Sequence, residues 1–113
     1  MTLTGKAMLA RIFLGESDRV GGRPAYKAVV EEARRRGLRG ATVLRGIMGY
    51  GAGSRIHAAA ILRLSEDLPI VVEIVDEEAR IRDFLPWLGE VLGGGLVTLE
   101  KVEVVRYAAG GGA

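Results

Sequence analysis

The chain has 113 residues, a length typical of one domain, and it contains no cysteine, which excludes disulfides and thiolate chemistry. Apolar residues make up 49% and the net charge is only +2 at pH 7, so the composition is globular and does not indicate a protein that coats nucleic acid. The apolar run at residues 7–14 is too short to span a bilayer, so we expect a soluble cytoplasmic protein without stable membrane insertion. The absence of Asn and Gln favours a thermophilic source.

The first predicted element is a strand at residues 7–14, where side chains alternate between two faces. Met8, Ala10, Ile12 and Leu14 share one face, and Ala7, Leu9, Arg11 and Phe13 share the other. After a polar, glycine-rich loop, Pro24 suits the first turn of a helix. Tyr26, Val29, Val30 and Ala33 follow at helical spacing, and Gly37 is a typical C-terminal stop.

The second half of the chain repeats this order. Residues 41–48 and 69–75 predict two strands, while residues 50–68 fit either a strand extension or a short helix. Asp76 is predicted to cap a second helix, in which Pro86 predicts a kink or a break. The glycines at 93–95 end this helix, a last strand occupies 96–106, and residues 108–113 form a flexible tail.

The order β-α-β-β-α-β predicts one α+β domain over residues 1–107, a ferredoxin-like fold with a four-stranded, mainly antiparallel sheet and two helices on one face. We expect the first and third strands to be central, parallel neighbours. The other sheet face then carries a pair of opposite charges, Arg11 and Glu73, among the side chains of Leu9, Phe13, Val43, Arg45, Val71 and Val75. Apolar faces of this kind usually mark an interface, so we expect a closed homo-oligomer.

The stretch "GATVLRGIMGYGAGSRIH" at residues 40–57 is the main candidate for ligand binding. Glycines allow backbone N–H groups to point at one anion, Arg45 and Arg55 add charge, and Tyr50 can stack on a base. The alternative is a mobile connection whose glycines only satisfy turn geometry. Gly93–Gly95, with Arg106 at the end of the last strand, form a second candidate, although a helix end followed by a loose turn explains these glycines more simply.

Other site chemistries are not supported by the sequence. "GYGAGS" lacks the spacing of a dinucleotide fingerprint, and no P-loop motif occurs. His57 is the single histidine, so no metal site is expected, and a catalytic serine has no clear partner. The aromatic-rich strand motif of RNA-binding domains is missing, so nucleic acid is not an expected partner.

Three stretches resemble the domain-of-unknown-function family 190 within the PII-like (GlnB-like) superfamily: "GATVLRGIMGYGAGSRIH", "LPIVVEIVD" and "GGLVTLEKVEVVRY". PII proteins are trimers that bind ATP or ADP in clefts between subunits. By this resemblance, Thr42, Gly49 and Gly51 fall at the base of the signalling loop, Gly93 to Gly95 in a second cleft loop, and Arg106 after the last strand. The second loop lacks the lysine usual in PII proteins, and Arg45 and Arg55 could replace it.

The resemblance implies a homotrimeric regulator without catalytic chemistry and with no required cofactor. It would bind a small anionic ligand of the ATP, ADP or AMP type, with the use of Mg²⁺ left open, and ordering of residues 49–68 would control a partner protein. The alternatives are a structural or protein-interaction trimer without a ligand, and an enzyme on a phosphorylated metabolite with His57 as its base. The predicted ligand-binding residues are Thr42, Arg45, Gly49, Tyr50, Gly51, Arg55, Gly93, Gly94, Gly95 and Arg106.

Overall fold

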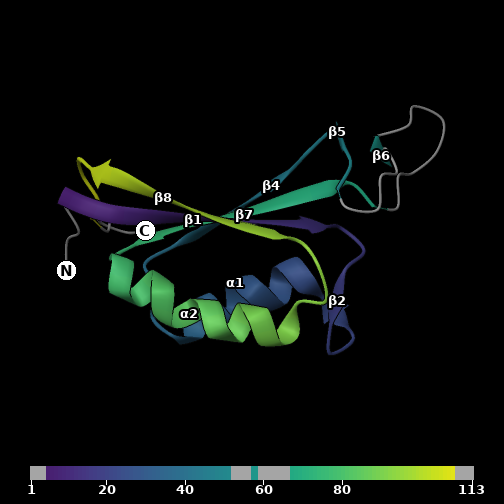
Figure 1. The fold of residues 1–113 in the computed structure, drawn as a ribbon, viewed down its shortest axis with the longest axis horizontal. Helices are drawn as coiled ribbons and strands as arrows, with labels where there is room; N and C mark the ends of the chain where they lie inside the picture. Colours follow the sequence, from purple (N-terminus) through teal and green to yellow (C-terminus); the bar gives the residue numbers. More distant parts are fainter. Residues whose placement is uncertain (1–4, 52–56, 59–66, 109–113) are drawn as a thin grey trace.

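The structure is a computed structural model that describes residues 5–51, 57–58 and 67–108. A four-stranded sheet forms one layer and two helices form the other, with a short hairpin and a short ribbon beside them (Figure 1). In chain order the elements are β1 (Gly5–Gly15), β2 (Arg19–Val20), β3 (Arg23–Pro24), α1 (Ala25–Arg35), β4 (Ala41–Arg45), β5 (Met48–Gly49), β6 (His57–Ala58), β7 (Pro69–Asp76), α2 (Glu78–Val91) and β8 (Leu96–Val104).

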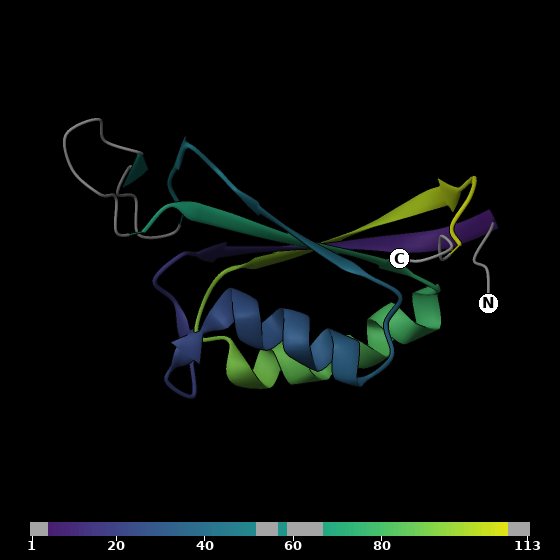
Figure 2. The same cartoon turned by 180° about the vertical axis from the view of Figure 1, so that it is seen from behind.

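The sheet has the order β4-β7-β1-β8, and both helices cover the same face (Figure 2). The predicted α+β, ferredoxin-like fold is therefore confirmed. β1 and β7 are the central strands, as expected, but the prediction that they are parallel was wrong, because they pair antiparallel. Each helical crossover joins two parallel strands that leave room for one strand between them. β7 lies between β4 and β1 in the sheet and pairs antiparallel with both, so it runs opposite to each of them.

The core lies between the sheet and the helices. The alternation predicted for β1 is confirmed, since Met8, Ala10, Ile12 and Leu14 are buried against the helices with Ile70, Val72 and Ile74 of β7. From the helical layer, Val29 of α1 and Phe84 of α2 are almost fully buried in the same cluster. Burial of each such side chain contributes about 1.5–3 kcal/mol, so this layer supplies most of the stability of the fold.

The first helix follows the prediction. α1 begins directly after Pro24 and carries arginines in its last turn, where cations meet the negative end of the helix dipole. Gly37 then adopts a φ of +81°, a conformation that favours glycine. The chain can therefore turn from the end of α1 toward β4.

The start of α2 differs from the prediction. Asp76 does not cap the helix, because the N-cap residue is Glu77 and no side chain bonds the helix end. Asp76 is instead the last residue of β7 and is fully buried. Pro86 does not divide α2, which continues from Glu78 to Val91. Pro86 is exposed, so water can satisfy the carbonyl that loses its helical donor.

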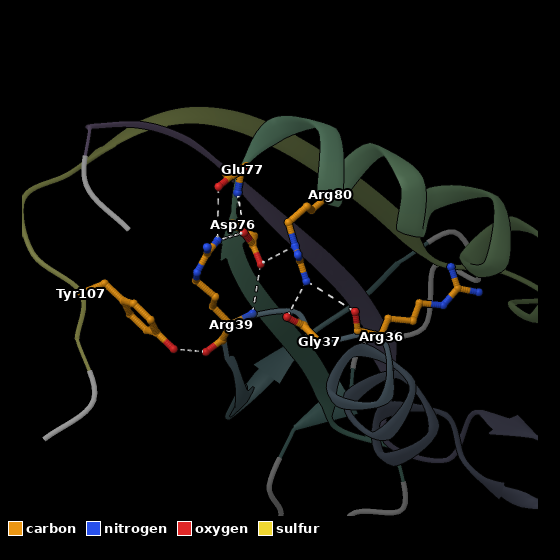
Figure 3. A network of polar contacts seen from close by, with 7 residues as sticks. All are labelled: Arg36, Gly37, Arg39, Asp76, Glu77, Arg80 and Tyr107. Atoms are coloured by element: carbon orange, nitrogen blue, oxygen red, sulfur yellow. Dashed lines mark hydrogen bonds and ion pairs between the residues drawn. The ribbon is translucent and has the colours of Figure 1, made fainter. Parts of the chain in front are cut away.

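Buried Asp76 is the centre of a polar network that joins four parts of the chain (Figure 3). Its carboxylate accepts hydrogen bonds from the Arg39 backbone N–H at 3.0 Å, the Arg39 guanidinium at 2.5 Å and the Glu77 backbone N–H at 2.7 Å. Arg80 lies 3.4 Å from the same carboxylate, and its guanidinium also donates to the Gly37 carbonyl at 2.5 Å. The connection between α1 and β4 is thereby fastened to the β7–α2 junction.

The C-terminal strand is shorter than predicted. β8 ends at Val104 rather than at residue 106. Beyond β8, the Tyr107 hydroxyl donates a hydrogen bond to the Arg39 carbonyl (Figure 3). This bond connects the chain after β8 to the Asp76 network, of which Arg39 is a member.

Most of the ambiguous segment 50–68 lies outside the described residues. Its described part at residues 57–58 is a strand, β6, which pairs antiparallel with β5 through Met48↔Ala58 and Gly49↔His57. The predicted strand 41–48 is interrupted after Arg45, where the backbone N–H of Gly46 turns to the Pro69 carbonyl at 2.7 Å.

Candidate functional site

A cavity of about 790 Å³ lies at the end of the sheet where β1 finishes and β7 begins. Gly15 and Pro69, the last pair in the register between these central strands, both line it. Segments from several elements meet around this pair because the strands leave the sheet here. The lining consists of residues 13–15, 18–19, 49–51 and 92–96 together with Ala25, Asp67 and Pro69.

Two glycine loops flank the central pair from opposite sides. β5 follows β4 on the β7 side, and β8 begins on the β1 side. At Gly49 an added Cβ would lie 3.1 Å from the Pro69 side chain. At Gly95 the φ is +111°, and a Cβ would lie 2.7 Å from the Phe13 carbonyl oxygen. Glycine therefore allows both loops to approach the strand ends closely, with their backbones beside the cavity.

The third side of the cavity is the turn after β1. The Gly15 backbone N–H donates to Asp18 Oδ2 at 3.0 Å, and the Ser17 N–H donates to Asp67 Oδ1 at 3.0 Å. The Glu16 N–H donates to the Leu68 carbonyl at 2.8 Å, so the turn is held on both sides. Asp18 and its neighbour Arg19 thereby bring opposite charges to the cavity wall.

The structure brings together six of the predicted site residues. Gly49, Tyr50 and Gly51 line the cavity from one side, and Gly93, Gly94 and Gly95 line it from the other. Tyr50 is 70% exposed, so its ring is available to a ligand or a partner. The two glycine runs, separated by more than forty positions in the sequence, thus belong to one place in the fold.

The other predicted site residues lie elsewhere. Thr42 stands opposite Glu73 on the sheet face away from the helices, and Arg45 forms an ion pair with Glu16. Arg55 lies outside the described residues. Arg106 follows β8, and the length of that strand places it about 30 Å from the cavity, at the opposite end of the sheet.

Sequence reasoning missed the charged residue Asp67 of the cavity lining and, in the turn after β1, the charged pair Asp18 and Arg19. Asp18 and Arg19 belong to "GESDRVGGR", which reads only as a polar loop. The one available signal was its position directly after the strand predicted at residues 7–14. That this loop faces both glycine runs depends on the antiparallel pairing of β1 with β7, which the sequence does not display.

The open face of the sheet, away from the helices, carries a three-residue charge cluster. The predicted Arg11–Glu73 pair is confirmed at 2.9 Å, and Arg11 also contacts Glu100 of β8 at 2.9 Å. The hydrogen bond from Glu73, followed by that from Glu100, raises the pKa of the Arg11 guanidinium above its ordinary value. Arg11 therefore remains charged at the centre of the face.

The edge strand β4 contributes different residues to this face than predicted. Val43 pairs with Val72 and Arg45 with Ile70, so both belong to the helix-covered side, and their predicted placement was wrong. Thr42 and Leu44 take the open face instead. Leu44 is 49% exposed and Leu96 of β8 is 56% exposed, so apolar surface surrounds the charge cluster. A partly apolar open face of this kind is typical of an interface.

Two kinds of feature are absent from the described residues. Within the described part of the chain, no helix has the length and apolar character needed to cross a membrane. Among the same residues, no group of three or more His, Cys, Asp or Glu side chains could hold a metal ion.

Residues 7–104 match the model of the DUF190 family, which is described as "Uncharacterized ACR". The chain belongs to the DUF190 family. A UPF0166 protein of Aquifex aeolicus is 47% identical over 102 residues, which cover 88% of this chain and 94% of the relative. A UPF0166 protein of Methanocaldococcus jannaschii is 38% identical over 102 residues, covering 89% and 94% respectively.

Solved structures similar to this DUF190 chain have the PII-like fold. A putative PII-like signaling protein of Thermus thermophilus superposes with a TM-score of 0.65 at 24% identity, covering 89% of this chain and 91% of the other. CPII of Thiomonas intermedia, described as bound to ADP and bicarbonate, gives 0.62 at 18% identity, with coverage of 94% and 93%. The GlnK–ATP complex of B. subtilis gives 0.55 at 13% identity, with coverage of 88% and 84%. The predicted resemblance to PII-like proteins and to family 190 is confirmed.

Proposed function

We propose that this DUF190 protein is a PII-like regulator without catalytic chemistry that binds an adenine nucleotide at the cavity between its glycine loops. The observation that carries the proposal is the convergence of residues 49–51 and 93–95 on one cavity of about 790 Å³. A cavity of this size suits a nucleotide-sized ligand. The nucleotides named for the CPII and GlnK structures, which share the fold, support this choice of ligand.

The lining offers distinct surroundings for the parts of a nucleotide. Backbone amides of the glycine loops and the Arg19 guanidinium suit phosphate oxygens, because they donate hydrogen bonds and positive charge. Leu14, Leu92 and Leu96 provide apolar wall for a base, on which the exposed Tyr50 ring can also stack.

A second copy of the chain completes the site in this proposal. Arg106 has no ion-pair partner among the described residues and lies far from the cavity of its own chain. The open sheet face, with the Arg11 cluster and exposed Leu44 and Leu96, provides a contact surface for a closed homo-oligomer. We infer a trimer in which Arg106 of one subunit reaches the cavity of the next.

Regulation follows from the position of the cavity beside residues 47–50. Ile47 and Met48 are 81% and 61% exposed, and Tyr50 joins them directly to the cavity lining. A nucleotide that contacts Tyr50 favours the arrangement of this segment that binds it best. The proposal is that ligand binding orders residues 49–68 and so changes the apolar surface offered to a partner protein.

Ligand-dependent stabilisation tests the proposal. Thermal unfolding is measured with AMP, ADP, ATP and cyclic AMP, each with and without Mg²⁺, and hits are confirmed by titration calorimetry. A ligand at a hundredfold excess over its Kd stabilises the folded state by about 2.7 kcal/mol. If none of these compounds changes the unfolding temperature, the proposed function is wrong, and a ligand-free interaction module is favoured.

Site variants locate any binding that is found. Arg19→Ala is expected to weaken nucleotide binding because it removes the arginine from the described lining. Arg34→Ala is the matched control, since Arg34 is an exposed arginine in the last turn of α1 and does not line the cavity. Equal affinities for both variants and the unchanged protein would place the ligand elsewhere.

A further inference from the structure

The cavity wall contains a carboxylate that phosphate recognition does not explain. Asp18 lines the cavity in the turn after β1, next to Arg19 in sequence. A carboxylate only accepts hydrogen bonds when ionised, and it repels phosphate oxygens. The hydrogen bond to the Gly15 N–H gives Asp18 Oδ2 a role in the turn, but the negative charge of Asp18 beside the cavity favours a hydrogen-bond donor on the ligand rather than phosphate.

Asp18 is also held in place before any ligand arrives. Its backbone N–H donates to the Gly15 carbonyl at 3.1 Å, and its own carbonyl accepts from the Ala25 N–H at 2.7 Å. Its Oδ2 accepts from the Gly15 N–H at 3.0 Å. The side chain and both backbone groups are thus engaged, which fixes the carboxylate at the wall with little freedom left to lose on binding.

The second carboxylate of the cavity has another role. Asp67 Oδ1 accepts from the Ser17 N–H at 3.0 Å, and a Cβ on Gly15 would lie only 2.4 Å from that same oxygen. Asp67 is therefore packed against the turn and supports it. Asp18 is more exposed than Asp67, so its carboxylate is the more accessible of the two.

We propose that Asp18 accepts a hydrogen bond from an uncharged donor group of the ligand and thereby makes the site selective for ligands that carry that group. The inference rests on the proposed nucleotide function. In an adenine nucleotide such donors are the ribose hydroxyls and the exocyclic amine, which share the chemistry that a carboxylate recognises. The neighbouring Arg19 and the glycine amides bind the anionic groups. Two adjacent residues of one turn thus bind chemically opposite parts of the ligand: Asp18 a hydrogen-bond donor and Arg19 a negative charge.

The test compares ADP with analogues that each lack one donor. Affinities are measured by titration calorimetry for ADP, 2′-deoxy-ADP, 3′-deoxy-ADP and inosine diphosphate. The unchanged protein is expected to prefer ADP over at least one analogue by about tenfold, the loss typical of a hydrogen bond to a charged group. The analogue that binds weakly identifies the donor.

Asp18→Asn separates recognition from folding. Its carbonyl oxygen can still accept from the Gly15 N–H, while the other oxygen is replaced by an amide group that cannot accept from the ligand. In this variant, ADP and the analogue that binds the unchanged protein weakly are expected to have about equal affinities. The affinity for pyrophosphate is expected to rise, because a negative charge is removed. Asp83→Asn, at an exposed carboxylate of α2 outside the cavity lining, is the control and keeps the preference.

The outcomes distinguish the two proposals. If no nucleotide binds the unchanged protein, the proposed function and this inference both fail. If ADP binds but no analogue is discriminated, or if Asp18→Asn keeps the preference, only the role of Asp18 is overturned. A parallel loss of affinity for ADP, its analogues and pyrophosphate in Asp18→Asn would show that Asp18 merely holds the turn, and would overturn the inference too.

Discussion

Replacing Asp76 with alanine is expected to destabilise the fold strongly. Asp76 is fully buried, and its carboxylate is the acceptor for two backbone N–H groups, those of Arg39 and Glu77. Both hydrogen bonds are partly buried, and a buried donor that is left without a partner costs about 1–3 kcal/mol. The Arg39 side chain is 11% exposed and, among the residues that the structure describes, would retain only Glu77, at 3.6 Å, as an ion-pair partner.

Together, these losses are expected to lower the free energy of unfolding by about 3–5 kcal/mol, the range typical of a buried ion pair that loses one member. This is a large share of the about 5–15 kcal/mol that stabilises a domain. Urea unfolding followed by circular dichroism, at one fixed protomer concentration, measures the change. Asp76→Asn keeps an acceptor oxygen and is expected to lose less than Asp76→Ala.

Asp83→Ala is the control, because Asp83 is exposed on α2 and substitutions at such sites change stability by about 0.5 kcal/mol or less. A loss below 1 kcal/mol for Asp76→Ala would refute the reasoning. It would mean that the network of Figure 3 is replaced at little cost by water or by new partners.

Three further predictions concern the open face, an ion pair on α1 and a glycine loop. Leu44→Glu places a carboxylate on the half-exposed, apolar part of the open face and is expected to yield monomers in sedimentation. The prediction is contradicted if the variant remains an oligomer, or if the protein without the substitution is already monomeric at micromolar concentration. Hydrogen bonds from Arg35, the last residue of α1, and from Arg36, its C-cap, lower the pKa of Glu32 from 4.5 to about 2, so the contribution of this group to stability is full above pH 4.5 and disappears as the pH falls toward 2. The difference in unfolding free energy between Glu32→Gln and the unchanged protein should therefore shrink between pH 4.5 and 2, and a constant difference would show that the pair does not form. Gly95→Ala should lose about 1–3 kcal/mol because of its φ of +111° and the close Phe13 carbonyl, whereas Gly94→Ala meets open space and should unfold nearly as the unchanged protein does; equal melting temperatures would argue against this loop geometry.

Local patterns were sufficient to predict most of the fold. The alternation in residues 7–14 predicted both faces of β1, and with them the contact between Arg11 and Glu73. The faces of β4 were predicted wrongly, because this strand has only five residues and its parity depends on where the chain breaks after Arg45. A one-residue change of register moves every side chain of a strand to the other face.

Long-range contacts explain what the sequence did not reveal. An aspartate before two glutamates at a helix start is typical of a cap, yet Asp76 is buried because Arg39, 37 positions away, meets it. Both glycine runs were recognised as candidates from composition, since glycine permits close backbone approach. Asp18 was not, because its place in the cavity follows from strand pairing and not from any motif around it.

The hydrogen bond from the Tyr107 hydroxyl to the Arg39 carbonyl joins residues 68 positions apart, so it connects the two ends of the segment 39–107. Tyr107 lies shortly after β8, an edge strand that pairs with β1 in the described sheet. Edge strands near a chain terminus are where a domain usually begins to fray. Here, separation of β8 from β1 at its Val104 end also requires loss of the hydrogen bond between Tyr107 and Arg39. This bond therefore opposes fraying of the edge strand by connecting it to a residue in the middle of the sequence.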